Sequence, residues 1–144
     1  MISRIQKWLS RMSADELEDH LRDAFVQASK RYRLPEVDES RPLNEIVFSW
    51  ERGYRVVDKK QIPLLRVVRV SIFRLPLTCT WDVEIHAELR SKSDVGTMEL
   101  MYKQFQKSQV RIWTHDREEF FIEQLGQAIS WVERAVPNGK TRAP

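Results

Sequence analysis

The sequence predicts an α+β fold in which an antiparallel β-meander of four to five strands is flanked by N-terminal and C-terminal helices. Apolar residues recur at helical spacing near both ends of the 144-residue chain, and they alternate with polar residues in the middle. Turn-forming residues separate the alternating runs at short intervals, as antiparallel hairpins require. A chain of this length buries roughly two thirds of its unfolded surface, which is enough for one self-sufficient core.

The first strong helix is predicted after Ser13. Ser13 and Glu16 have the spacing of a capping box, and acidic residues fill the first turn, where the helix dipole favours them. Pro35 then stops the helix. We interpret the polar segment over residues 35–42 as a connecting loop. The apolar stripe of this helix consists of Leu17, Leu21, Ala24, Phe25, Ala28 and Tyr32.

The apolar period changes from about 3.6 to 2 after this loop, which indicates a strand. Ile46, Phe48 and Trp50 alternate with their neighbours, so we expect a strand over Glu45–Val57. Gly53 interrupts the alternation and is interpreted as a β-bulge.

Two runs rich in β-branched residues, 64–74 and 79–89, form the next predicted hairpin. A four-residue loop between them places Arg74 opposite Cys79. The same register pairs Arg69 with Glu84 on the polar face. On the other face it pairs Ile72 with Trp81, Val70 with Val83, and Val68 with Ile85.

The last third of the chain is predicted to add two strands and a helix. Residues 97–105 fit a strand and a helix alike, and we favour a strand because a meander is the simplest continuation. A short strand over residues 110–114 follows, and then a helix whose capping box is Asp116 with Glu119. We expect one domain over residues 1–137 and a flexible tail over residues 138–144. The apolar stripe of this helix consists of Phe121, Leu125, Ala128, Ile129, Val132 and Val136.

The composition narrows the class of protein. The chain has 24 basic and 21 acidic side chains, a net charge of +3, and a single cysteine. Cys79 has no internal disulfide partner and cannot form a cysteine-based zinc site alone, so we expect a cytoplasmic protein. No apolar run approaches the roughly 18 residues that span a bilayer.

One strand carries the residues with the clearest chemical potential. Asp82, Glu84, His86 and Glu88 alternate, so all four face the same side at about 6.8 Å per step. Two carboxylates and an imidazole suit a divalent metal, which makes a metal-dependent enzyme one alternative. Neighbouring side chains in such a row are too far apart to bind one ion without further ligands from another strand. We therefore favour a solvated face, with no catalytic residue, cofactor or metal.

A second alternative is nucleic-acid binding by residues 52–74. This region has seven basic residues against one acidic residue, Asp58, and it includes Tyr54 and Phe73. Strand alternation divides Arg66 and Arg69 between two faces, however, and the acidic first helix would repel phosphates. We expect no strong binding to nucleic acid.

The leading hypothesis is a non-enzymatic binding or interaction domain that self-associates as a homodimer, through a sheet edge or an apolar face. The predicted edges are Glu45–Val57 and residues 110–114, and neither contains a proline. The first twelve residues form a basic amphipathic segment that suits a partner's groove, a membrane surface or the end of the sheet. The candidate interaction surface consists of Ile2, Ile5, Trp8, Leu9, Val67 and Phe73.

Overall fold

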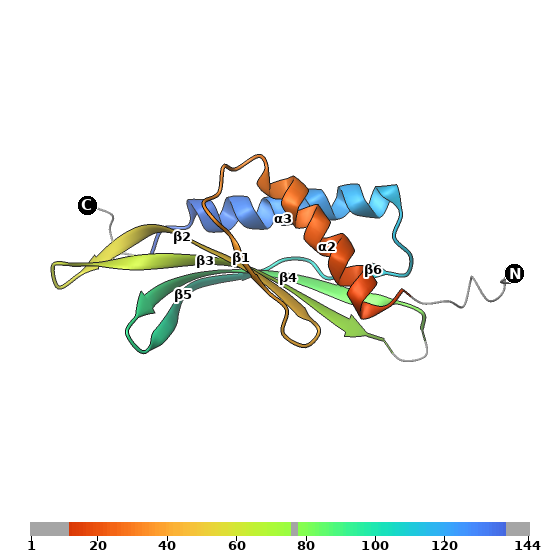
Figure 1. Cartoon of the computed structure of the whole chain (residues 1–144), viewed down its shortest axis with the longest axis horizontal. Helices are drawn as coiled ribbons and strands as arrows, with labels where there is room; N and C mark the ends of the chain where they lie inside the picture. Colours follow the sequence, from red (N-terminus) through yellow and green to blue (C-terminus); the bar gives the residue numbers. More distant parts are fainter. Residues whose placement is uncertain (1–11, 76–77, 138–144) are drawn as a thin grey trace, which may run out of the picture.

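The computed structural model describes residues 12–75 and 78–137 as a two-layer α+β fold. Both helices lie on one face of an antiparallel sheet, and no other described element covers the opposite face, which we call the open face (Figure 1). This arrangement confirms the predicted fold class. The elements are α2 (Ala14–Ser29), β1 (Asp38–Ser40), β2 (Glu45–Val57), β3 (Lys60–Arg74), β4 (Trp81–Ser93), β5 (Gly96–Gln104), β6 (Ser108–Val110) and α3 (His115–Arg134).

The sheet runs in the order β1-β2-β3-β4-β5, and β6 pairs with the first residues of β4. Residues 97–105, which fitted a strand and a helix alike, lie largely in strand β5, so the strand interpretation is confirmed. The expected strand over 110–114 is wrong, because the short strand ends at Val110. The expected loop over 35–42 contains strand β1, whose polar sequence carries no alternating apolar signal.

The core lies between the helices and the covered sheet face. Phe25 of α2 stacks on Phe48 of β2 with ring centroids 3.8 Å apart and planes 3° from parallel. Trp50 is 1 % exposed beside them. The apolar stripes of both helices are buried here from Leu17 to Ala28 and from Phe121 to Val132, as their helical spacing predicts. The assignment of Tyr32 and Val136 to the stripes is wrong, because α2 ends at Ser29 and α3 at Arg134, and Val136 is largely exposed.

The helix caps differ in how well the sequence predicted them. Ser13 accepts a hydrogen bond from the backbone N–H of Glu16 at 3.1 Å, which confirms the first cap. The second cap is Thr114, which accepts from the N–H of Arg117 at 3.2 Å, so the assignment to Asp116 is wrong. Asp116 lies in the first turn instead, where its charge favours the helix dipole. The pair of Thr114 and Arg117 lacks the acidic or amide residue that marks a capping box.

The predicted register of the β3–β4 hairpin is wrong by two residues. Arg74 pairs with Trp81 rather than Cys79, and Ile72 pairs with Val83. The predicted strand over 79–89 accordingly begins at Trp81, and Cys79 lies in the connection. A shift of two keeps every side chain on its predicted face, so the apolar pattern cannot distinguish the two registers. Arg69 therefore lies opposite His86 and not Glu84.

Helix α2 also buries one carboxyl, Glu18, which is 7 % exposed. Burial raises the pKa of this carboxyl, while the nearby charge of Arg41 opposes that rise. A carboxyl whose pKa is higher in the folded than in the unfolded state stabilises the fold when it is protonated. That contribution is lost as the pH rises through the folded-state pKa.

We expect Glu18→Gln to raise the free energy of unfolding at neutral pH, because glutamine stays uncharged. The difference from the wild type should vanish below about pH 4, where Glu18 is protonated in both states. Urea unfolding over a pH series measures this. Asp23→Asn, at an exposed site on the same helix, is the control. A lower stability of the Gln variant at neutral pH would show that the Glu18 charge stabilises the fold.

Candidate functional site

The open face of β4 carries Asp82, Glu84, His86 and Glu88 in one row, as alternation predicts. Each of the last three has a neighbouring charged or polar group. Glu88 lies 3.5 Å from Arg69 and 3.2 Å from Arg90, and Glu84 lies 3.1 Å from Lys107 and 3.3 Å from His86. His86 also contacts the hydroxyl of Tyr102 on β5.

This row does not converge on a metal site. Across residues 12–75 and 78–137, no group of three His, Cys, Asp or Glu side chains is placed to hold an ion. Most of the carboxylates instead lie in ion pairs along the sheet, and Arg69 reaches both Glu88 and Glu45. We interpret the open face as a surface on which ion pairs compensate most of the charge. The sequence predicted a single Arg69–Glu84 pair, but Arg69 pairs with Glu45 and Glu88, and Glu84 pairs with Lys107.

The basic residues of 52–74 are dispersed over the sheet. Arg66 is 6 % exposed and lies on the covered face, and Arg52 pairs with Glu133 of α3 at 2.8 Å. Lys59 and Arg74 lie at opposite ends of the β2–β3 pair. The region therefore presents no single cationic surface to a phosphate backbone.

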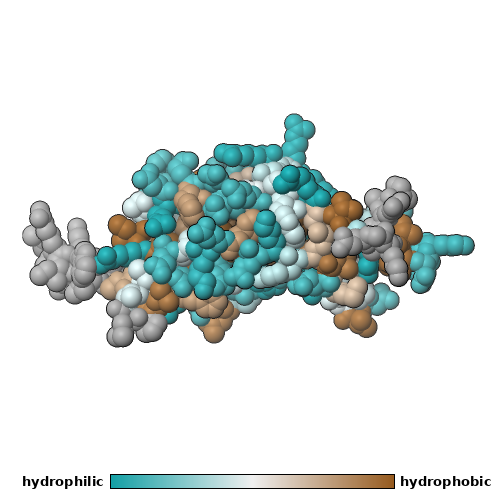
Figure 2. Space-filling model, turned by 180° about the vertical axis from the view of Figure 1, so that it is seen from behind, coloured by the Kyte–Doolittle hydropathy of each residue, from teal (hydrophilic) through white to brown (hydrophobic). Residues whose placement is uncertain are grey.

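The candidate interaction surface is only partly described. Ile2, Ile5, Trp8 and Leu9 lie outside the described residues. Val67 is 3 % exposed, whereas Phe73 is 48 % exposed at the end of β3. Apolar side chains on the face seen in Figure 2 lie in separate patches within a mostly hydrophilic surface.

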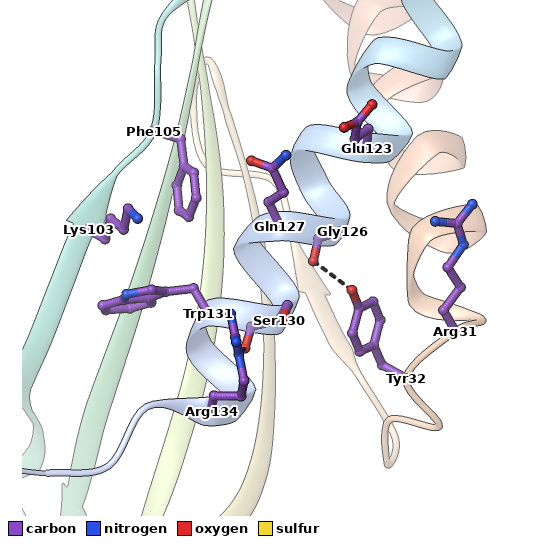
Figure 3. A pocket seen from close by; sticks show the side chains of 10 residues that line it. All are labelled: Arg31, Tyr32, Lys103, Phe105, Glu123, Gly126, Gln127, Ser130, Trp131 and Arg134. Atoms are coloured by element: carbon purple, nitrogen blue, oxygen red, sulfur yellow. Dashed lines mark hydrogen bonds between the residues drawn. The ribbon is translucent and has the colours of Figure 1, made fainter.

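A different region, a hollow across α3, brings together unpaired cations and aromatic rings (Figure 3). Its volume is about 380 Å³. The turn after α2 forms one side, β5 and the residue after it form the other, and α3 forms the floor. We call it the α3 hollow. Its lining consists of Arg31, Tyr32, Lys103, Phe105, Glu123, Gly126, Gln127, Ser130, Trp131 and Arg134.

Small residues of α3 keep the floor of the hollow low. Gly126 and Ser130 are one helical turn apart, and taller side chains stand on either side of them. The Tyr32 hydroxyl donates a hydrogen bond to the Gly126 carbonyl at 3.1 Å, which fixes the turn after α2 against α3. Trp131 and Phe105 form the opposite wall (Figure 3).

The lining carries an excess of positive charge. Arg31, Lys103 and Arg134 surround the hollow, and Glu123 is the only carboxylate among its residues. None of the three cations forms an ion pair with a described carboxylate; Arg134 donates to the Ser130 carbonyl at 3.3 Å, and Lys103 lies 5.0 Å from the centroid of the Phe105 ring. The remaining described arginines include several that do form such pairs, namely Arg22, Arg41, Arg52, Arg66, Arg69 and Arg90.

Sequence reasoning did not find this site, because its residues come from three separate segments. Tyr32 was assigned to the apolar stripe of the first helix. Trp131 lies beside the apolar stripe of α3 and carried no separate signal. Only the folded chain brings the turn after α2, the end of β5 and α3 together around the hollow.

Comparisons with known proteins add no functional information. No protein-family model, curated protein or solved structure matches the chain. Neither described helix is long and apolar enough to cross a membrane. The functional assignment therefore rests on the geometry of the site.

Proposed function

We propose that this protein is a non-enzymatic binding domain that holds an anionic ligand in the α3 hollow. The observation that carries the proposal is the group of three cations, Arg31, Lys103 and Arg134, without carboxylate partners among the described residues. Arginine and lysine side chains form charge-assisted hydrogen bonds with anions. The rings of Tyr32 and Trp131 add flat apolar surface, which suits a ligand with an aromatic or apolar body.

The lining supports binding better than catalysis. Its only carboxylate, Glu123, is exposed, and no histidine or cysteine lines the hollow. General acid–base catalysis needs a positioned proton donor or acceptor, and covalent catalysis needs an activated nucleophile. The residues around the hollow supply charge and stacking surface instead.

Self-association through a sheet edge stays a prediction, with less support than the sequence suggested. The expected edge at β2 is partly covered by β1, which pairs with Val47 to Ser49. Beyond this cover, β2 has a bulge at Gly53, and β5 at the other edge has one at Leu100. Bulges twist an edge away from flat pairing, and the charges of Glu99 and Lys103 add to that protection.

A simple aromatic anion tests the proposed site. Naphthalene-2-sulfonate should bind the wild-type chain at least about tenfold more tightly than naphthalene-2-methanol, its uncharged counterpart, in isothermal titration calorimetry. Lys103→Glu should weaken sulfonate binding by about tenfold or more, because it removes one attractive charge and adds a repulsive one. Added salt should weaken binding further, since the hollow is open to solvent.

Arg74→Glu is the matched control, because it makes the same charge change at an exposed residue at the end of β3 that does not line the α3 hollow. It should leave the dissociation constant of the sulfonate within about twofold. Equal affinity for the charged and uncharged probes, or equal effects of the two variants, would refute an anion site in the α3 hollow.

A further inference from the structure

Two smaller hollows continue the α3 hollow toward the C-terminal end of α3. Trp131 and Arg134 line both the α3 hollow and a second hollow of about 240 Å³, which adds Met101 of β5. Ala135 and Val136 line the second hollow and also a third of about 160 Å³, which lies beside β2 and β3. We call this series of three the α3 groove.

The chemistry of the groove changes along its length. The first hollow carries all three unpaired cations. The second and third have one arginine each, Arg134 and Arg66, among mostly apolar side chains such as Met101 and Val136. Val136 is 61 % exposed although it follows a well-packed helix. An occupant that fits the whole groove therefore has negative charge at one end and apolar side chains at the other.

Charge argues against the chain's own undescribed ends as the occupant. Residues 1–11 contain Arg4, Lys7 and Arg11, and residues 138–144 contain Lys140 and Arg142. Neither stretch contains an acidic residue. Both would bring further positive charge to a hollow that already has an excess of it. An acidic partner is complementary where these segments are not.

We infer that the α3 groove binds an extended segment of a partner protein in which acidic residues precede or follow apolar ones. The acidic residues contact the cations of the α3 hollow, and the apolar residues occupy the hollows beside Met101 and Val136. This inference rests on the proposed anion site and adds the class of ligand. It also predicts that the apolar end of the groove contributes to affinity, which the binding of a small anion does not require.

Selection from a displayed library of random peptides tests this prediction. We suggest peptides of about twelve residues, which reach up to ~40 Å when extended. Selection on the full chain should enrich peptides that combine Asp or Glu with a cluster of apolar residues. In fluorescence polarisation, Lys103→Glu should weaken the binding of a selected, labelled peptide by about tenfold or more. Arg74→Glu should leave it nearly unchanged.

Val136→Asn separates the inference from the proposed function, because it removes apolar surface and adds no charge beside Arg134. Because Val136 is largely exposed, this change leaves the core intact. It should weaken the selected peptide by about tenfold while naphthalene-2-sulfonate binds as in the wild type. Enrichment of neutral or basic peptides, no enrichment at all, or no effect of Val136→Asn would overturn the inference and leave the anion site standing. If the wild-type chain does not bind naphthalene-2-sulfonate, both the anion site and this inference are refuted.

A second copy of the chain is the competing occupant, because α2 exposes the acidic side chains of Asp15, Glu16 and Asp23. Sedimentation equilibrium distinguishes it from a separate partner. A monomer at high micromolar concentration supports a peptide from another protein. A dimer that Lys103→Glu dissociates would overturn the inference in favour of self-association through the α3 groove.

Discussion

Replacing Arg66 by leucine is expected to lower the free energy of unfolding by about 3–5 kcal/mol. Arg66 is the one charged side chain of β3 that lies buried on the covered face of the sheet, and its side chain is 8 % exposed. Its guanidinium donates to the carbonyls of Val132, Glu133 and Ala135, at or just after the end of α3. The last carbonyls of a helix have no partners within the helix, so Arg66 satisfies groups that the fold would otherwise leave buried and unbonded.

The loss should be large because leucine removes several partners at once. The Glu133 carboxylate lies 3.6 Å from Arg66 and has a side chain only 12 % exposed, and it also accepts from the Trp50 indole at 3.1 Å. Without Arg66, that buried charge keeps Arg52 as its only ion-pair partner among the described residues. Burial lowers the pKa of Arg66 itself, because the loss of water disfavours its charged form.

Urea unfolding monitored by tryptophan fluorescence measures the change. Arg55→Leu is the matched control, because Arg55 lies on the neighbouring strand with a single side-chain hydrogen bond, to Ser91 at 3.1 Å. It should cost about 1 kcal/mol or less. An Arg66→Leu loss as small as that of the control would mean that Arg66 does not hold the end of α3.

The second large effect is expected for Trp81→Ala, at about 3–5 kcal/mol. Trp81 is 5 % exposed, begins β4, and pairs with both Arg74 of β3 and Val110 of β6. Its indole N–H donates to the Met12 carbonyl at 2.8 Å, so the ring also fixes the chain just before α2. Alanine removes the packing of the ring and leaves this carbonyl without its donor.

Thr80→Ala, one residue earlier, provides the comparison. Thr80 lies before the strand begins, and its hydroxyl contacts that of Thr78 at 2.7 Å in an exposed position. We expect a loss well below about 1 kcal/mol. Similar losses for the two variants in urea unfolding would contradict the placement of Trp81 in the core.

The sequence predicted which face of each long element is buried, and it did so for a physical reason. Apolar residues repeat with a period of 3.6 on the buried face of a helix and of 2 on the buried face of a strand. The sequence therefore predicted the stripes of α2 and α3 and the covered faces of β2, β3 and β4. The hairpin register was not readable, because a shift of two residues preserves those faces. β1 was missed because three polar residues carry no period.

The role of Arg66 left a signal that the sequence interpretation did not use. Leu64, Val68 and Val70 occupy the same face as Arg66, so a lone arginine interrupts an otherwise apolar row. A buried arginine needs several acceptors, and an exposed cationic patch is a poor explanation for it. The α3 hollow left no comparable signal, because Tyr32, Lys103 and Trp131 are distant in sequence and meet only in the folded chain.

A titration of ¹⁵N-labelled protein with naphthalene-2-sulfonate, followed by NMR, tests the central claim that the α3 hollow is the ligand site. We expect the largest shifts at the indole N–H of Trp131 and at the backbone amides of Gly126 and Lys103, which line the hollow from two elements. The amides of Phe73 and Glu84, on the open sheet face, should move little. Largest shifts on the open face, with Trp131 and Gly126 unmoved, would contradict the assignment of the site.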